Sequence, residues 1–270
     1  MTRIRTDAAR IGTESISSRG NDIMCNFKRN LLAGVLFTLG AVSAFQTQAA
    51  VTMMGTRIVF PGDQSEVSVR LQNVGETPSL VQAWIDDGDV DAAPSASKVP
   101  FIVRPPMFRI NGGKSQVIRI ATAGAMLPGD RESLFGFNVL DVPAQAAKQA
   151  GEGGATLQLV VRTRVKMFYR PKGLSRAAAA KAPTQLQWQV TTGPGAHGLR
   201  VTNPTPYHVI VKKVASAGIA VDEVVVAPLS HHTYALSPQQ HQALKESITF
   251  EYAVTDTGVV VAAQAPLSLP

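Results

Sequence analysis

Cysteine is almost missing from this sequence. Its 270 residues include one cysteine, Cys25, and it lies in the first 50 residues, a stretch with the features of an export leader. The mature chain would then hold none, which excludes a disulfide framework, a cysteine-ligated metal and a thiol nucleophile. A chain without cysteine is also compatible with export to an oxidising compartment.

Motifs of the common catalytic sites are absent as well. The sequence has no G-x-S-x-G, no H-E-x-x-H and no P-loop pattern. The acidic residues Asp86, Asp87, Asp89 and Asp91 lack the glycine and the terminal glutamate of an EF-hand, so we expect a solvated loop there. These absences predict a protein that is not an enzyme and that has no cofactor and no metal site.

The few histidines are not arranged as metal ligands. The adjacent His231 and His232 would point to opposite sides of a strand or lie in a turn, so they would not easily bind one metal together. We expect surface-loop residues at all five positions: His197, His208, His231, His232 and His241.

Positive charge exceeds negative charge only mildly. The formal net charge is +7, from 26 Lys and Arg and 19 Asp and Glu. Six of the basic residues and three of the acidic ones lie before residue 50, so the rest of the chain carries +4. A nucleic-acid site needs a dense basic patch with stacking aromatics, and aromatic residues make up 6% of this sequence. Nucleic acid is therefore not a predicted partner.

Residues 1–49 are predicted to be a signal peptide. Lys28 and Arg29 precede an apolar run over residues 31–42, and small and polar residues follow up to Ala50. This order is typical of a secretory leader, and we expect cleavage near the end of that stretch. The alternative is a single membrane anchor, but the run is shorter than the roughly 20 residues that a spanning helix needs.

The true start of the leader stays open. Translation could begin at Met1 or at Met24, and residues 1–23 would form an upstream extension in the first case. After cleavage, we expect no membrane span in the mature chain and a periplasmic location.

Apolar and polar residues alternate through most of the chain after residue 50. Val67, Val69 and Leu71 alternate with polar residues, which is the pattern of a strand with one buried face. Further short strands are expected at 58–60, 80–85, 101–103, 117–120, 134–139 and 157–165. Pro105 and Pro106 are expected to block continuation of one of them. Short strands separated by frequent turns predict an all-β sandwich.

A break divides the predicted strands into two groups. Pro171 and Gly173 interrupt the pattern, and the alanine-rich stretch 176–182 favours either one helical turn or a linker. Alternation resumes in six segments: 186–190, 199–201, 209–211, 224–226, 248–252 and 259–261. We therefore predict an all-β protein with an N-terminal Ig-like domain over residues 50–171 and a C-terminal Ig-like domain over residues 172–270.

Four segments, in this order along the chain, resemble the PapD-like periplasmic pilus chaperones of the chaperone–usher family: 55–61, 128–143, 164–171 and 203–207. The resemblance implies two immunoglobulin-like β-sandwich domains in an L-shaped arrangement with a cleft between them. It also implies a function. Such a protein binds, folds and caps pilus subunits by donor-strand complementation and delivers them to an outer-membrane usher.

The resemblance assigns roles to individual residues. Arg57 and Lys166 would bind the C-terminal carboxylate of a pilus subunit, because two converging cations fix a carboxylate through charge-assisted hydrogen bonds. An interdomain ionic network would consist of Glu132, Arg170 and Asp256.

The donor strand would comprise Leu157, Leu159 and Val161, which alternate with polar residues. These side chains would fill an open groove of the subunit; the alternative is that they face their own domain's core. The preceding stretch 144–156 is small, polar and glycine-rich, which predicts a flexible loop that could order on binding. Its short length favours the branch of the family that serves rod-like pili.

Three further alternatives stay open. The chain could be an Ig-like structural or adhesive pilus-type surface protein, although neither a donor segment of its own nor a disulfide is evident. It could also be a secreted hydrolase, which would need a clustered nucleophile and base. A free edge strand is prone to association, so a self-capping dimer of the free protein is also conceivable.

Overall fold

The computed structural model describes residues 51–91, 93–94, 98–124, 127–144, 159–193, 196–219 and 223–269. Residues 49–270 form one compact unit. The predicted leader and most of the predicted loop at 144–156 lie outside the described residues. In the part of the chain that is described, no helix is long and apolar enough to cross a membrane.

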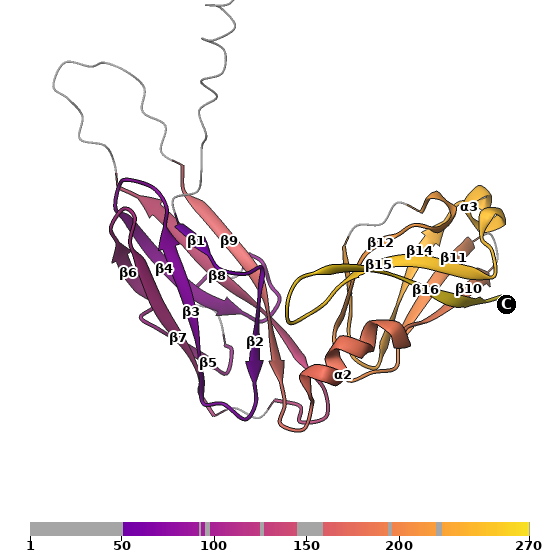
Figure 1. Ribbon diagram of the computed structural model, residues 1–270, viewed down its shortest axis with the longest axis horizontal. Coiled ribbons are helices and arrows are strands. Elements are labelled where there is room, and N and C mark those ends of the chain that lie inside the picture. Colours follow the sequence, from indigo (N-terminus) through magenta and orange to yellow (C-terminus); the bar gives the residue numbers. More distant parts are fainter. Residues whose placement is uncertain are drawn as a thin grey trace, which may run out of the picture. The chain divides into compact units, whose positions relative to one another are not determined.

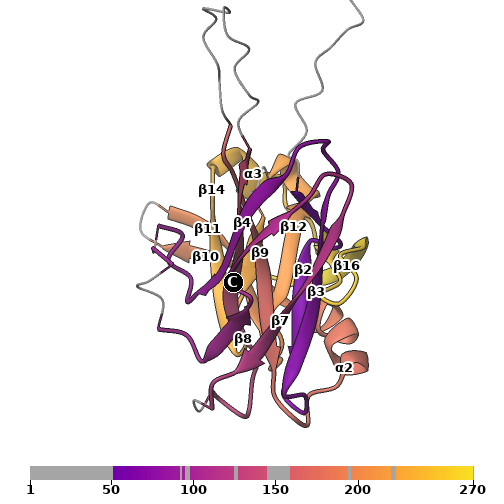
Figure 2. The same cartoon turned by 90° about the vertical axis from the view of Figure 1, so that its left-hand side faces the viewer.

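The chain up to Arg170 forms two β-sheets (Figure 1). The four-stranded sheet has the order β1 (Val51–Met53), β3 (Glu66–Asn73), β7 (Ser115–Thr122) and β5 (Phe101–Arg104). The five-stranded sheet has the order β2 (Arg57–Pro61), β9 (Val161–Arg170), β8 (Ser133–Pro143), β4 (Ser79–Asp86) and β6 (Met107–Ile110). Figures 1 and 2 show β3 and β7 side by side, as their antiparallel pairing requires.

The inner faces of these two sheets enclose one hydrophobic core. In β3, Val69 and Leu71 are buried while their polar neighbours are exposed, which confirms the predicted alternation. An aromatic group fills one part of this core. The rings of Phe101 and Phe135 meet edge to face at 5.0 Å between centroids, and Phe60 lies 5.4 Å from Phe101. Edge-to-face rings bury large apolar surfaces in a favourable geometry.

The prolines at 105 and 106 end the strand before them, as predicted, since β5 stops at Arg104. Strand β6 begins directly after them and pairs with β4, whereas β5 before them pairs with β7 in the other sheet. The prolines therefore lie where the chain crosses between sheets. Proline lacks only a donor, and the carbonyl of Pro106 still accepts a hydrogen bond from the backbone of Ala83 at 2.8 Å.

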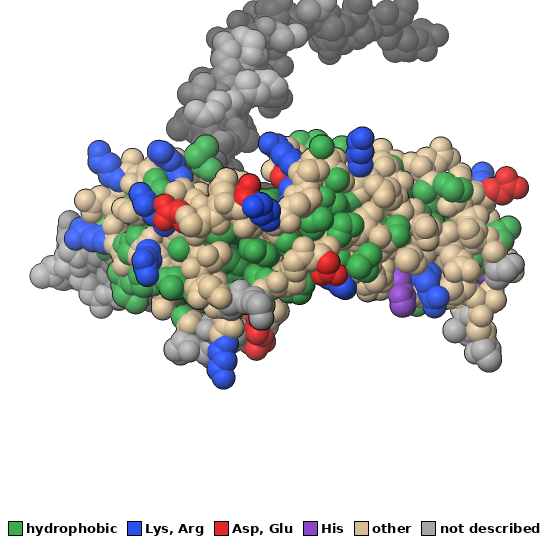
Figure 3. Space-filling model, turned by 90° about the horizontal axis from the view of Figure 1, so that it is seen from below, with side chains coloured by type: hydrophobic (Ala, Val, Ile, Leu, Met, Phe, Trp, Pro, Cys, Tyr) green, Lys and Arg blue, Asp and Glu red, His purple; other side chains and the backbone are tan. Residues whose placement is uncertain are grey.

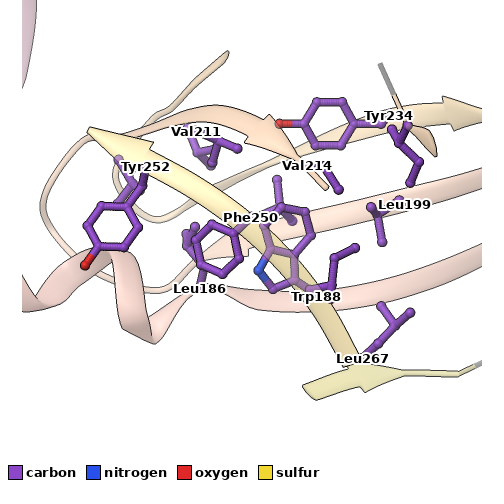
Figure 4. Close-up of a cluster of buried hydrophobic side chains, with 14 of the residues drawn as sticks. Leu186, Trp188, Leu199, Val211, Val214, Tyr234, Phe250, Tyr252 and Leu267 are labelled. Atoms are coloured by element: carbon purple, nitrogen blue, oxygen red, sulfur yellow. The ribbon is translucent and has the colours of Figure 1, made fainter. Parts of the chain in front are cut away.

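The rest of the chain forms a second set of strands. Their order is β13 (Val224–Val226), β12 (Val209–Val214), β15 (Ser247–Ala253), β16 (Val260–Ser268), β10 (Gln187–Gly193), β11 (Ala196–Asn203) and β14 (Ser230–Leu236). Their core is built around Trp188, whose ring lies 5.1 Å from that of Phe250 (Figure 4). The predicted all-β class is confirmed.

Short helices connect these strands. They are α2 (Arg176–Lys181), the 3-10 turns η1 (Ala182–Gln185) and η2 (Ser216–Gly218), and α3 (Pro238–Ala243). The alanine-rich stretch is thus a helix rather than a linker. Its N-cap is Ser175, whose side chain accepts a hydrogen bond from the backbone of Ala178 at 3.1 Å. A good cap and strong helix formers stabilise a helix this short only together with packing, which Ala179 provides by its burial.

Basic side chains lie apart from one another on one face of the molecule. Figure 3 shows Lys and Arg spread over the face in view, some of them beside Asp or Glu side chains.

The turn between β6 and β7 provides a test of how closely two backbone segments approach each other in this fold. A Cβ added to Gly112 would overlap the backbone carbonyl of Glu76, whereas a Cβ on Gly129 would meet nothing within 4 Å. We expect Gly112→Ala to lower the free energy of unfolding by about 1–3 kcal/mol, because backbone atoms cannot move aside cheaply. Urea denaturation of both variants measures this. An equal stability of Gly112→Ala and the control Gly129→Ala would contradict the close approach.

Candidate binding site

Two of the predicted site residues come together through the pairing of β2 with β9. The two strands run parallel, and Arg57 is the Cα partner of Lys166. Directly paired residues of adjacent strands point to the same side of a sheet, so both cations lie on one face. β2 provides Arg57 at its first residue, and β9 provides Lys166 near its middle.

A carboxylate from the second half of the chain lies against Lys166. One oxygen of Glu223 accepts a hydrogen bond from the Lys166 ammonium, and its other oxygen accepts one from Lys212. All three side chains are about one-third exposed. Burial alone would raise the pKa of Glu223, but the hydrogen bonds and positive charges of the two lysines hold it below its ordinary value.

Arg57 has different surroundings. Its Nη1 donates to the backbone carbonyl of Val254 at 3.2 Å, and its buried Nε has no acceptor among the described residues. Burial lowers the pKa of Arg57, and the charge of Glu223 opposes that shift. An arginine with an unused donor beside a lysine can bind a further anionic group.

The first half of β9 has one unpaired edge. β8 pairs with β9 from Val161 to Tyr169, but β2 pairs with it only from Lys166 to Arg170. Within the described ranges, no strand pairs with residues 161–165 on the β2 side. The exposed Leu159 lies just before this edge, 52% exposed. Unpaired backbone groups beside exposed apolar side chains form a template for another strand.

The predicted donor residues are only partly described. Leu157 lies outside the described residues. Leu159 precedes β9, and Val161 is the first residue of that strand. Side chains alternate along β9, so Val161 lies on the same side of the sheet as the buried Met167.

A polar network spans β4, β8 and the first half of β9 on the opposite side of the sheet. Arg164 forms two hydrogen bonds with Asp86, at 2.6 and 2.8 Å, and Asn138 donates to the same carboxylate at 2.7 Å. Arg162 donates to Asn138 at 2.9 and 3.0 Å, and its guanidinium lies 5.0 Å from the centre of the Trp84 ring. The network therefore ties the half-paired strand to its two neighbours.

Asp86 corrects the prediction of a solvated acidic loop. Asp87, Asp89 and Asp91 are exposed, but Asp86 is fully buried at the end of β4. Burial would raise the pKa of Asp86, but hydrogen bonds from Arg164, Asn138 and the backbone of Gly88 lower it to about 2. The sequence did contain an indication that a carboxylate of this group is paired. Arg162, Arg164 and Lys166 recur at every second residue of β9, and a row of like charges favours a carboxylate on a neighbouring strand.

Arg170 lies within ion-pair distance of both other predicted network residues, Glu132 and Asp256. Arg170 Nε donates to Glu132 at 2.8 Å, and its two terminal nitrogens donate to Asp256 at 3.0 and 3.1 Å. The other oxygen of Glu132 accepts the backbone N–H of His208 at 2.8 Å. Burial would raise the pKa of Glu132, but the bonds from His208 and Arg170 hold it below its ordinary value.

The histidine prediction was wrong in part. His208 is 6% exposed and packs 5.5 Å from the ring of Phe168. His197, His231 and His232 lie in strands, and His241 lies in α3. No group of three or more metal-ligating side chains occurs in the part of the chain that is described.

Two family models of one family match most of the described chain. Residues 50–175 match the family model described as "Pili and flagellar-assembly chaperone, PapD N-terminal domain". Residues 181–265 match the model described as "Pili assembly chaperone PapD, C-terminal domain".

Individual relatives are also similar. The "Probable fimbrial chaperone YadV" of Escherichia coli K12 is 38% identical over 224 residues, covering 81% of this chain and 90% of the relative. The "Chaperone protein FimB/FhaD" of Bordetella pertussis is 39% identical over 196 residues, which cover 71% of this chain and 78% of the relative. The crystal structure of the Pseudomonas aeruginosa CupB2 chaperone superposes with a TM-score of 0.64 at 33% identity, covering 80% of this chain and all of that one. The fold class of two Ig-like β domains is thereby confirmed.

The buried ionic group generates a stability prediction. Replacing Arg170 with alanine would leave Glu132 buried without its cation, so we expect a loss of about 3–5 kcal/mol in the free energy of unfolding. The neighbouring Arg131 pairs with Asp130 at the surface, and Arg131→Ala should leave stability almost unchanged. Urea denaturation at neutral pH measures both variants. A small effect of Arg170→Ala would mean that the group adds little to the fold.

The Asp86 network generates a pH prediction. A carboxylate whose pKa is lowered by folding stabilises the protein above its unfolded pKa, and that stability is lost as the pH falls through the folded pKa. The wild type should therefore lose stability between about pH 4 and pH 2 partly through Asp86. Asp86→Asn should be less stable at pH 7 and show a flatter slope in that window, whereas the exposed control Asp87→Asn should not. Urea midpoints measured across the window test this, and parallel slopes for both variants would contradict it.

Proposed function

The chain belongs to the PapD-type family of pilus-assembly chaperones, and we propose that it holds a pilus subunit by lending it the unpaired edge of β9. This family is not an enzyme family. A structural or adhesive surface protein is not favoured, because the named relatives are chaperones.

The observation that supports this mechanism is the half-paired edge of β9. An extended segment of another chain can add to residues 161–165 through main-chain hydrogen bonds, which provide affinity without sequence specificity. Apolar side chains at alternate positions then provide specificity. We propose Leu157, Leu159 and Val161 for this role, in a groove that an incomplete subunit leaves open.

Arg57 and Lys166 are proposed as the anchor for the subunit's C-terminal carboxylate. Both cations lie on one face, at the point where β2 stops covering β9. A carboxylate bound there would set the register of the added strand, because each residue of slip would move the apolar side chains to the wrong face.

The buried group of Glu132, Arg170 and Asp256 has a structural role in this proposal. Glu132 and Arg170 precede the proposed boundary between domains at residues 171 and 172, and Asp256 follows it. A buried cation between two carboxylates ties the two proposed domains, 50–171 and 172–270, to each other.

Export and delivery complete the proposal. Cleavage of the predicted signal peptide over residues 1–49 would release the chain into the periplasm. An outer-membrane usher is proposed as the second partner, which takes the subunit from the chaperone.

The test is co-expression of candidate pilus subunits with this protein in a bacterial periplasm. We expect the wild type to yield a soluble one-to-one complex, and Lys166→Ala to reduce its recovery by about tenfold or more, because a charge-assisted contact is lost. Lys213→Ala is the matched control, since Lys213 is an exposed lysine of β12.

The outcomes separate the parts of the proposal. Equal recovery with Lys166→Ala would remove Lys166 as the anchor while leaving the chaperone function in place. No recovery with any of several subunits would contradict the function itself and revive the alternative of a structural pilus-type protein.

A further inference from the structure

The proposed anchor already holds a carboxylate of the chain itself. We infer that Glu223 is a resident competitor for the subunit's carboxylate, and that Lys212 is a third cation of the same site. This inference rests on the proposed function, because it concerns the same lysine. It adds that a subunit binds by exchanging one carboxylate for another.

The register of the strands explains why Glu223 lies there. β13 pairs with β12, with Val224 opposite Val211, and Glu223 is the residue just before β13. Continuing this antiparallel register by one residue places Glu223 opposite Lys212. Lys166 reaches the same carboxylate from β9. The contact therefore joins residues from separate strands, and each carboxylate oxygen accepts from one ammonium group.

The charges favour exchange over simple addition. Arg57, Lys166 and Lys212 provide three positive charges, and Glu223 provides one negative charge. When a second carboxylate replaces Glu223 at the lysines, each ammonium keeps an anionic partner. Glu223 can return to water at small cost, because its side chain is 29% exposed where it stands. A fully buried carboxylate could not leave in this way.

A resident carboxylate also makes the site selective. Its effective concentration at the lysines is high because it belongs to the same chain, so free carboxylates in solution compete poorly with it. A subunit has a second source of affinity, the strand that adds to the β9 edge, and can displace Glu223 with both contacts together. The anchor thus responds to a carboxylate attached to an extended peptide.

The first test examines the free protein and needs no ligand. An ammonium group that is hydrogen-bonded to a carboxylate is shielded from reagents, so Lys166 and Lys212 should react slowly with an amine acetylating reagent at neutral pH. In Glu223→Gln, we expect their acetylation rates to rise about three- to tenfold, measured by mass spectrometry of digests. Lys213 and Lys245 serve as internal controls. Unchanged rates at Lys166 and Lys212 would overturn the resident contact.

The second test measures exchange. The probe is a synthetic peptide with the C-terminal strand of the subunit recovered in the co-expression experiment, made with a free carboxylate and with a C-terminal amide. We expect Glu223→Gln to bind the free acid about three- to tenfold more tightly than the wild type, and to bind the amide without such a gain. Glu246→Gln removes the same charge from an exposed position and should behave like the wild type.

The pattern of results separates this inference from the proposed function. If the wild type binds the acid and the amide equally well, the carboxylate anchor itself is wrong. If the wild type prefers the acid but Glu223→Gln changes neither affinity, the anchor stands and Glu223 is not a competitor. A loss of stability in Glu223→Gln without a change in acid preference would assign the residue a structural role only.

Discussion

The partial pairing of β2 with β9 is the constraint on which the rest of this structure depends. The parallel ladder begins at Arg57 with Lys166 and ends at Pro61 with Arg170. Because it covers only the second half of β9, the first half has a free edge. The same register places two cations, Arg57 and Lys166, at the first pair of the ladder. It places a third, the buried Arg170, at the last pair.

A free edge has to be held in an extended conformation without a strand beside it. The network around Asp86 achieves this from the other neighbour, since Arg162 and Arg164 of β9 bond to Asn138 of β8 and Asp86 of β4. Gly136 makes room for it, because any Cβ there would overlap the Arg164 guanidinium and the Asp86 carboxylate. Charged side chains along an edge also oppose uncontrolled association between sheets. An edge that is rigid before binding loses less entropy when it accepts a strand.

Local sequence patterns were sufficient to predict the strands. They were insufficient to predict the side-chain contacts between strands that are distant in sequence. Alternation in β3 and the break at 171–173 are properties of a few adjacent residues. The alternation predicted the all-β class, and the break predicted two groups of strands. Glu223 gave no signal, because its contact with Lys166 depends on strands that are distant in sequence. His208 was wrongly expected at the surface for the same reason, since its backbone bonds to Glu132, 76 residues away. The resemblance named Arg57, Lys166 and the residues around Arg170, and their roles in binding stay predictions.

The same pairing of carboxylate with cation serves two purposes in this chain, and burial decides which. Glu132 is fully buried against Arg170, so neither partner can be solvated alone and the contact must persist as long as the fold does. Glu223 and Lys166 are each about one-third exposed, so water can take over either partner when the contact opens. Strand β9 therefore carries a permanent ion pair at Arg170 and an exchangeable one at Lys166. The chain can release its own carboxylate at one position while the other keeps the strand in place.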